Sequence, residues 1–179
     1  MKYQDSWDGG VVEPGKRECA ARYEIIKAFC QKFDHPFTVC DIGANMNYFG
    51  MRLTEDFDCR VMSFEFHQFE MREKLVKNNK KLMFLKRKVS LDDLQILNAC
   101  AHFDLVLAMS VLHHLPGDTA KWLAEFNKLG DYVILEFALS DSERVKSKTN
   151  YIVPDSQLLG YGDSHLKKDF KRPIVLLNK

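Results

Sequence analysis

Residues 38–50, Thr-Val-Cys-Asp-Ile-Gly-Ala-Asn-Met-Asn-Tyr-Phe-Gly, have the residue types and spacing of a ligand-binding corner. The apolar run at 38–42 predicts a buried strand, and Gly43 predicts the turn that leads into a helix. In α/β sheets, a strand that ends at a glycine and opens a helix builds a crevice for nucleosides. The chemistry that this segment favours is therefore nucleoside binding.

The turn differs from the dinucleotide fingerprint in its glycines. That fingerprint needs three glycines, and the second lets the backbone approach a pyrophosphate. Here Gly43 is followed by Asn45 and Asn47. Asparagine tolerates a positive φ better than most residues, so the turn itself remains possible. A side chain at position 45 argues against a pyrophosphate and favours a nucleoside ligand without phosphates.

His113 and His114 are the sharpest catalytic candidates in the sequence. They follow the apolar segment 103–109, which predicts a strand, and ligands of open α/β sheets bind at the carboxyl ends of strands. Adjacent side chains at such a turn point in different directions, so one ring could face a ligand while the other packs structurally. No third ligand stands at a suitable spacing, so the sequence does not predict a metal site.

The apolar pattern predicts the elements that position these residues. Strands are predicted at 38–42, 60–65, 82–86, 103–109 and 131–137, and helices at 17–33, 47–56, 68–79, 91–100 and 117–128. This alternation predicts βαβ units and a doubly wound, mostly parallel α/β sheet. Strands at 157–162 and 173–178 must pair antiparallel, because a parallel crossover needs a dozen or more residues. The polar segment 139–156 predicts a loop.

The composition is that of a globular protein and argues against several classes of function. The 179 residues are 46% hydrophobic and 28% charged, and the net charge of +1 creates no field that would attract nucleic acid or an anionic membrane. No apolar run approaches the roughly 18 residues of a membrane span, and the N-terminus has no apolar signal region. Five scattered cysteines without a C-x-x-C pair predict free, mostly buried thiols in a cytoplasmic protein.

The order of elements and the motifs resemble class I S-adenosylmethionine-dependent methyltransferases. Asp41-Ile42-Gly43-Ala44-Asn45 is similar to the first motif of that family, Glu65 ends the second strand, and Met109-Ser110-Val111-Leu112-His113-His114-Leu115 follows the fourth. The resemblance implies a Rossmann-like fold, S-adenosyl-L-methionine as the cofactor and methyl transfer as the activity.

The resemblance also implies roles for single residues. Asp41 would accept a hydrogen bond from the amino group of the cofactor, and Glu65 would accept from both ribose hydroxyls. Phe66 could pack on the adenine face. Ser90 could bind the adenine edge or simply cap the helix at 91–100. The remaining cofactor contacts of the core fall at Gly43, Ala44, Asn45, Asn47, Phe49, Met109 and Ser110.

Motifs at the two ends narrow the resemblance. Tyr3-Gln4, Trp7-Asp8, Arg22, Gly162-Asp163-Ser164-His165-Leu166 and Arg172-Pro173 together resemble the methyltransferase domain of bacterial O-antigen chain-terminating enzymes. In that family an N-terminal arm with Tyr-Gln and a following Arg closes over the methyl donor, which implies that Tyr3, Gln4 and Arg22 cover the cofactor. Its members methylate a terminal sugar hydroxyl or phosphate, so the expected partner is a small-molecule or saccharide acceptor.

The domain organisation follows from these segments. We expect one methyltransferase domain over residues 1–179. It comprises an irregular arm at 1–16, a nucleoside-binding core at 17–137 and an acceptor-side ribbon at 138–179.

The sequence leaves the acceptor and the activity open. A sugar hydroxyl needs a general base, which His113 or His114 would supply. A phosphate monoester is already close to a dianion and needs only cations, such as His165 and Arg172. A nicotinamide dehydrogenase is disfavoured by Asn45 and by the antiparallel ribbon. A module that binds S-adenosylmethionine or a protein partner without catalysis is the alternative to an enzyme.

Overall fold

A computed structural model of the chain describes residues 3–67, 79–138, 155–164 and 171–178. The chain divides into two compact units, Met1–Lys88 and Val89–Lys179. The predicted helix at 68–79, almost all of the predicted loop at 139–156, and His165 lie outside the described residues.

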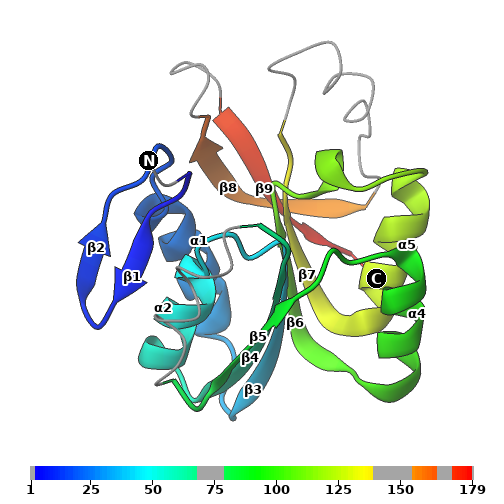
Figure 1. Cartoon of the computed structure of the whole chain (residues 1–179), viewed down its shortest axis with the longest axis horizontal. Coiled ribbons are helices and arrows are strands. Elements are labelled where there is room, and N and C mark those ends of the chain that lie inside the picture. The colour runs from blue at the N-terminus through cyan, green and yellow to red at the C-terminus, as the bar shows by residue number, and fades with distance from the viewer. Residues whose placement is uncertain (1–2, 68–78, 139–154, 165–170, 179) are drawn as a thin grey trace. The chain divides into compact units, whose positions relative to one another are not determined.

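The first unit contains a parallel three-stranded sheet. Its strands are Phe37–Ile42 (β3), Cys59–Glu65 (β4) and Leu82–Lys86 (β5), in the order β5-β4-β3 (Figure 1). The helices are Ala20–Cys30 (α1) and Tyr48–Asp56 (α2), and α2 packs on β4 and β5. The predicted strands are confirmed to within one residue, because apolar runs of this length are buried only as strands covered by helices.

The first helix is shorter than the sequence predicted. The prediction was 17–33, whereas α1 covers Ala20–Cys30. At its end, Lys32 and Phe33 donate to the carbonyls of Phe29 and Cys30, at 3.3 and 3.1 Å. These bonds span three residues instead of four, which tightens the chain into a turn before Pro36.

The N-terminal arm forms a hairpin, so the prediction of an irregular segment at 1–16 was wrong. Ser6–Asp8 (β1) and Val11–Glu13 (β2) pair antiparallel. Gly9 and Gly10 form the turn between them with φ angles of 50° and 95°. A two-residue turn with positive φ at both positions matches the twist of paired strands, and glycine adopts it without strain. The Gly-Gly pair was the signal that the sequence analysis missed.

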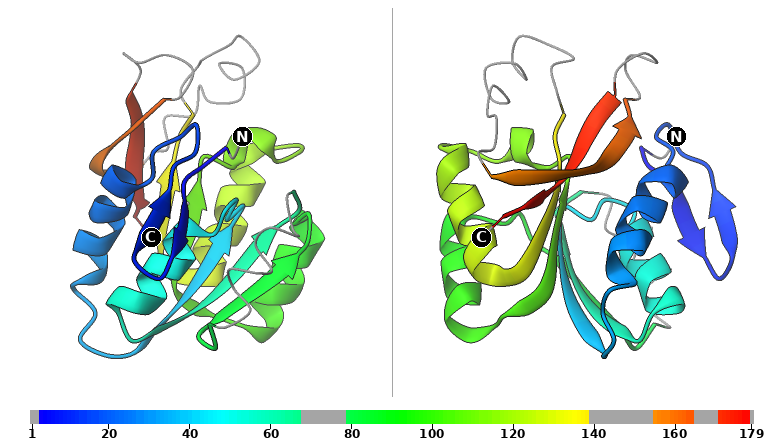
Figure 2. Two further views of the ribbon diagram at one scale, coloured as in Figure 1. Left: turned by 60° about the vertical axis from the view of Figure 1, so that its left-hand side comes forward. Right: turned by 180° about the vertical axis from the view of Figure 1, so that it is seen from behind.

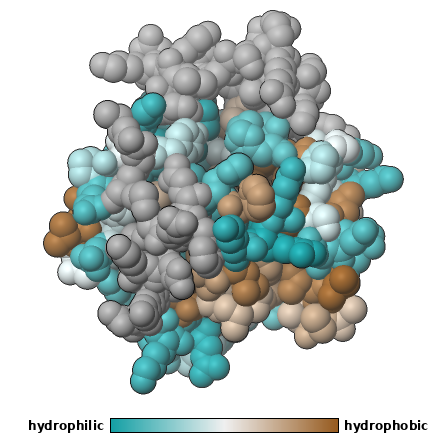
Figure 3. Space-filling view, in the orientation of Figure 1, coloured by the Kyte–Doolittle hydropathy of each residue, from teal (hydrophilic) through white to brown (hydrophobic). Residues whose placement is uncertain are grey.

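A cluster of rings around Arg52 joins the hairpin to α2. The guanidinium of Arg52 lies 4.2 Å from the ring centroids of both Trp7 and Tyr23. Trp7 also donates from Nε1 to Glu55 at 2.7 Å. Figures 1 and 2 show the hairpin alongside α2. The hairpin exposes Val11 and Val12, by 61% and 43%, and Figure 3 shows hydrophobic residues on this side of the molecule.

The second unit combines two parallel strands with an antiparallel ribbon. Its elements are Leu91–Cys100 (α4), Phe103–Met109 (β6), a short 3₁₀ helix at Leu112–His114 (η1), Thr119–Leu129 (α5), Gly130–Glu136 (β7), Ser156–Asp163 (β8) and Lys171–Leu177 (β9). The order is β6-β7-β9-β8, with β6 and β7 parallel and β9 antiparallel to both neighbours. The predicted antiparallel pairing of the last two strands is confirmed. Helix α5 packs on β6 and β7 and lies beside α4 (Figure 1).

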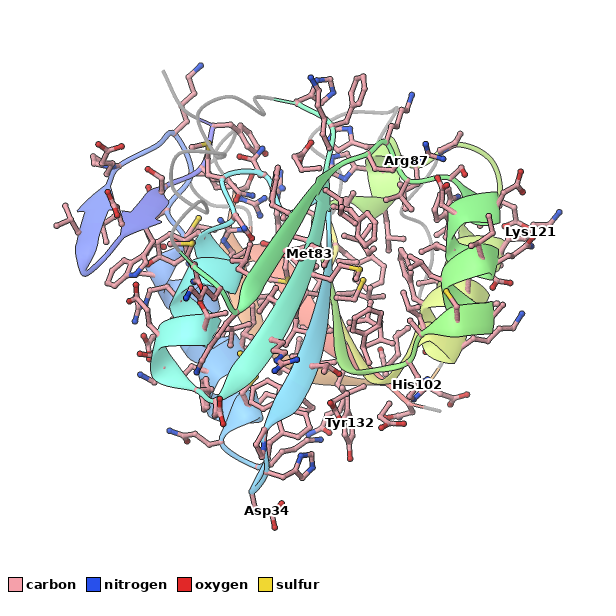
Figure 4. All side chains as sticks on the ribbon, turned by 60° about the horizontal axis from the view of Figure 1, so that its bottom comes forward. Asp34, Met83, Arg87, His102, Lys121 and Tyr132 are labelled. Carbon is pink, nitrogen blue, oxygen red and sulfur yellow. The ribbon has the colours of Figure 1, made fainter. Side chains whose placement is uncertain are left out.

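Side chains before β6 and early in β7 lie at the opposite end of these strands from the histidine pair. His102 precedes β6, and its Nε2 lies 3.0 Å from Asp131 Oδ1. Figure 4 labels His102 and Tyr132 at this end, and Lys121 projecting outward from α5. His102 is therefore placed away from the carboxyl ends of the strands, where ligands of α/β sheets bind.

The five cysteines are free, as the sequence predicted. Cys19, Cys30, Cys40 and Cys59 are buried and Cys100 is exposed. Burial raises the pKa of Cys19 to about 11 and that of Cys30 to about 12, so these thiols stay protonated and unreactive near neutral pH.

Across the described ranges, no helix combines the length and the apolar character needed to cross a membrane.

Candidate functional site

The corner between β3 and α2 has the left-handed turn that its sequence predicted. Gly43, Asn45 and Asn47 have φ angles of 76°, 48° and 57°. The amides of Gly43 and Ala44 donate to the Phe64 carbonyl at 2.9 and 3.1 Å, which ties the turn to the end of β4. Asparagine takes this conformation at a modest cost, so the corner closes without further glycines.

Glu65 fixes this corner through its carboxylate. Oε2 accepts from the Asn45 amide at 2.9 Å, and Oε1 accepts from the amides of Phe66 and His67 at 2.7 and 2.8 Å. A carboxylate has about four acceptor positions, so three backbone amides leave about one. The sequence predicted that Glu65 would accept from two ribose hydroxyls. With about one acceptor position left, on Oε2, Glu65 has room for one ribose hydroxyl rather than for both.

Three buried polar atoms of the corner have no hydrogen-bond partner among the described residues. They are Asp41 Oδ2, Asn45 Oδ1 and Asn47 Nδ2. Buried polar groups in native proteins are almost always paired, so three unpaired ones at one corner call for a partner, such as a ligand or an ordered water. The set offers two acceptors and one donor.

The carboxyl of Asp41 is 1% exposed, and burial, together with the charge of nearby Glu65, raises its pKa to about 7. A buried carboxylate without a partner favours its neutral form, because desolvation penalises the charge. A ligand amino group at Asp41 would reverse this preference by supplying a compensating positive charge.

Two residues that the sequence analysis did not select support Asn47. Ser63 donates its hydroxyl to Asn47 Oδ1 at 2.9 Å. A Cβ at Gly50 would lie only 2.5 Å from the same oxygen, so any other residue there would displace the Asn47 side chain. The signal in the sequence was the glycine inside a helical pattern, at a position where close packing is the usual reason.

The arm residues assemble around a buried arginine. Arg22 is 1% exposed; its Nε and Nη2 donate to the Glu18 carbonyl at 3.1 and 3.0 Å, and Nη2 lies 3.0 Å from Cys19 Sγ. The guanidinium lies 5.3 Å from the centroid of the Phe49 ring. Gln4 is also buried, with Oε1 4.0 Å from Cys19 Sγ. The structure thus brings Gln4, Arg22 and Phe49 together around Cys19, which the sequence analysis did not select.

Tyr3 joins this group through its backbone. Its carbonyl accepts from the Arg17 amide at 2.9 Å, beside the bridge between Gln4 and Arg17. Asp5 accepts from the amides of Gly15 and Cys19 at 2.7 and 2.8 Å, which secures the arm to the start of α1.

Two further predicted residues have defined surroundings. Phe66 is 48% exposed and meets His67 edge to face, with centroids 5.1 Å apart. An exposed ring beside Glu65 is available to pack on a flat group. Ser90 caps α4: its hydroxyl accepts from the Asp93 amide at 3.1 Å and donates to Asp93 Oδ2 at 2.8 Å. The capping alternative for Ser90 is thus present in the structure.

In the second unit, a corner of the same kind follows β6. Met109 ends β6 and is 3% exposed, and Ser110 has a φ of 57°. The short helix η1 then carries His113 and His114, whose ring centroids lie 3.9 Å apart with the planes tilted by 43°. Both rings are in contact, so the expectation that they would point apart does not hold: a single turn of 3₁₀ helix keeps them side by side.

Arg172 lies in this second unit, 3% exposed, with Nη1 donating to the Ser110 hydroxyl at 3.2 Å. Within the described part of the chain, no group of three His, Cys, Asp or Glu side chains could hold a metal ion.

Comparisons with known proteins identify the fold. No family model matches the sequence. The chain is similar to the tRNA U34 carboxymethyltransferase of Aliarcobacter butzleri (strain RM4018), with 28% identity over 132 residues, covering 69% of this chain and 41% of that protein.

Solved structures resemble nearly the whole chain. WbdD, co-crystallised with the kinase inhibitor LY294002, superposes with a TM-score of 0.75 at 20% identity, covering 92% of this chain and 42% of that one. The N-terminal domain of EvdMO1, in the presence of SAH and D-fucose, gives a TM-score of 0.67 at 11% identity, covering 99% and 91%. The chain therefore spans less than half the length of the Aliarcobacter protein and of WbdD, 41% and 42%.

This chain has the α/β fold of class I S-adenosylmethionine-dependent methyltransferases, with parallel strands and an antiparallel C-terminal ribbon. The fold that the motifs implied is confirmed.

Proposed function

We propose that this chain is an S-adenosylmethionine-dependent methyltransferase that acts on a small-molecule or saccharide-type acceptor. The observation that carries the proposal is the cluster of unpaired buried atoms on Asp41, Asn45 and Asn47, at the corner where this fold binds its nucleoside. Buried polar atoms are usually paired in native proteins, so three such atoms at one corner favour a ligand there.

The donor set fits S-adenosylmethionine. Asp41 would accept from its amino group, Asn45 and Glu65 would accept from ribose hydroxyls, and Arg22 would face its carboxylate. When bound, this cofactor supplies a methyl group on a positively charged sulfur, which an acceptor oxygen can attack. The similar N-terminal domain of EvdMO1 supports the choice, because it was crystallised in the presence of SAH.

The histidine pair would supply the proton chemistry for a hydroxyl acceptor. A sugar hydroxyl is a weak nucleophile, and its attack is helped by a base within hydrogen-bond reach. With ring centroids 3.9 Å apart, two positive imidazolium rings would repel each other. The pair therefore favours at least one neutral ring, and a neutral imidazole nitrogen can take the proton from the hydroxyl.

The saccharide acceptor rests on weaker support than the cofactor does. The crystallisation of EvdMO1 with D-fucose favours a sugar, and the net charge of +1 gives no general attraction for nucleic acid. The name of the Aliarcobacter relative favours tRNA instead. Both acceptors therefore belong in the test.

Calorimetry with S-adenosylmethionine and with S-adenosylhomocysteine tests the cofactor. We expect saturable 1:1 binding in the micromolar range that a dedicated site typically gives. No heat at millimolar cofactor would rule out the methyltransferase assignment.

A panel of sugars, sugar phosphates and unmodified tRNA, assayed for transfer of a radiolabelled methyl group, then tests the acceptor. Transfer to a sugar supports the full proposal. Transfer to tRNA alone keeps the enzyme class and changes the acceptor, whereas binding without transfer to any of these indicates a non-catalytic module. Loss of transfer in either His113→Ala or His114→Ala, with cofactor binding retained, supports the histidine base. Full activity in both variants contradicts it and favours a phosphate acceptor.

A further inference from the structure

A buried three-residue link connects β9 and β7 to the corner that carries the histidine pair. Ser110 Oγ donates to Glu136 Oε2 at 2.7 Å and accepts from Arg172 Nη1 at 3.2 Å. Glu136 is 0% exposed, Arg172 3% and Ser110 8%. A single hydroxyl thus bridges a buried carboxylate and a buried guanidinium.

The backbone reinforces the same link. The Ser110 amide donates to the Glu136 carbonyl at 3.0 Å, and the Phe137 amide donates to the Pro173 carbonyl at 3.1 Å. Register pairs Glu136 with Ile174, two residues after Arg172. Side chain and main chain together therefore fix the ends of β6, β7 and β9 to one another.

Ser110 holds an unfavourable conformation at this point. Its φ of 57° is rare for a residue that is neither glycine nor asparagine and costs about 1 kcal/mol or more. Such a conformation persists only when the surroundings determine it. The two hydrogen bonds of the Ser110 hydroxyl and the hydrogen bond of its amide together hold this φ angle.

The corner that Ser110 begins is short. Val111 separates it from η1, the helix with His113 and His114, and the His114 amide donates back to the Val111 carbonyl at 2.8 Å. A rotation at Ser110 would therefore displace both imidazole rings, because no flexible segment lies between.

We propose that Ser110, Glu136 and Arg172 are positioning residues that hold the histidine corner in its working arrangement. The relevance to catalysis rests on the proposed function, in which a histidine is the base. The sequence predicted Ser110 as a cofactor contact and Arg172 as an acceptor contact. In this proposal both residues act through the corner, because the Arg172 guanidinium donates to the buried Ser110 hydroxyl.

Two features make this arrangement more than ordinary packing. Burying two opposite charges is costly, and it is tolerated only where further hydrogen bonds satisfy them. The bridge also places those charges at a strained corner beside the candidate base rather than in the middle of the core. In many proteins, replacing such a buried charged pair by apolar residues leaves the fold equally stable, so stability alone does not account for the pair. A role in positioning the corner does.

The test is nuclear magnetic resonance of the intact chain labelled with ¹³C at histidine Cε1. The chain has six histidines, at 35, 67, 102, 113, 114 and 165, so the spectrum is simple, and single His→Gln variants assign it. We expect Ser110→Ala and Arg172→Lys to shift or broaden the signals of His113 and His114. His102, at the far end of the seven-residue β6 and roughly 20 Å away, serves as the internal reference.

Non-additive effects of two substitutions distinguish a coupled network from two separate local disturbances. Ser110→Ala breaks both bonds of the hydroxyl at once. If the three residues act as a unit, Arg172→Lys should therefore cause little further shift in that background. Equal, additive shifts from the two changes would overturn the proposal, as would signals of His113 and His114 that do not respond to Arg172→Lys.

Asn98→Ala is the matched control. It removes two partly buried hydrogen bonds of the same unit, from Asn98 Nδ2 on α4 to the carbonyl and to Oε2 of Glu125 on α5, at 3.2 and 2.7 Å. We expect a comparable loss of thermal stability with no change at His113 and His114. A similar response from Asn98→Ala would show that the histidine signals report general destabilisation, and would overturn the proposal.

Binding of S-adenosylhomocysteine distinguishes the two proposals. Positioning residues should leave its dissociation constant within about threefold of the parent. A loss of more than tenfold in Ser110→Ala but not in Arg172→Lys would make Ser110 a cofactor contact and overturn its positional role. If the parent binds no cofactor at all, the proposed function fails, while the histidine spectra still decide the structural claim.

Discussion

Glu65 combines a structural and a proposed binding role in one carboxylate. It accepts the amides of Asn45, Phe66 and His67, and it is the proposed acceptor for the ribose. We expect Glu65→Ala to weaken S-adenosylhomocysteine binding by about 1–3 kcal/mol, roughly 5- to 150-fold, the range of lost charge-assisted hydrogen bonds. Calorimetry measures it. Asp58→Ala removes an exposed carboxylate of the same unit and should leave affinity unchanged. Equal affinity in Glu65→Ala and the parent would remove Glu65 from the site.

Asp41 makes stability depend on pH in a defined direction. Burial and the Glu65 charge raise its pKa from 3.8 to about 7 in the folded state. The folded protein therefore binds more protons than the unfolded chain between about pH 4 and pH 7, and its stability falls as pH rises through that window. Without cofactor, Asp41→Asn should have a free energy of unfolding close to that of the parent near pH 4, and should be more stable than the parent at pH 8 by up to about 4 kcal/mol.

Thermal melts across this pH range measure the effect. Asp58→Asn, at an exposed carboxylate, should follow the parent at every pH. A constant difference between Asp41→Asn and the parent from pH 4 to pH 8 would mean that Asp41 is charged throughout.

At the scale of elements, the hairpin depends on one side chain of α2. Arg52 lies between the rings of Trp7 and Tyr23, and a partly buried cation over aromatic rings contributes about 1–2 kcal/mol. We expect Arg52→Ala to speed amide hydrogen exchange in residues 6–13 by roughly tenfold while β3 and β4 keep their protection.

Arg52→Lys refines this prediction, because lysine keeps the charge but lacks the flat group that stacks. It should give an intermediate rate. Lys81→Ala, which loses only an exposed ion pair, is the control. Unaltered exchange of the hairpin in Arg52→Ala would show that β1 and β2 are held by other contacts.

At the scale of the whole molecule, binding of a ligand should raise the free energy of unfolding. A ligand at 100 times its dissociation constant stabilises the folded state by about 2.7 kcal/mol, which for a chain of this size raises the melting temperature by roughly 5–10 °C. We expect this shift with S-adenosylhomocysteine and little or none with NAD, whose pyrophosphate needs a glycine where Asn45 stands. An equal shift with NAD would favour a dehydrogenase-like ligand instead.

The sequence alone determined the features that depend on neighbours along the chain. Apolar periodicity located the strands, Ser90 marked the start of α4, and Asn45 and Asn47 fixed the left-handed turn, because helix caps and backbone angles are set within a few residues. The separation of the last two strands likewise required their antiparallel pairing. The hairpin also depends on residues that are neighbours in the sequence, so its Gly-Gly turn could have been predicted.

Only the tertiary structure decided where the polar side chains of the site point. The Glu65 carboxylate turns toward the amide of Asn45, and the Ser110 hydroxyl joins Glu136 to Arg172, 62 residues along the chain from Ser110. Spacing does not encode these bonds, because they depend on which strands become neighbours and on how deeply each group is buried. The same burial leaves Asp41, Asn45 and Asn47 with unpaired atoms, and these atoms support the proposal that the corner binds a ligand.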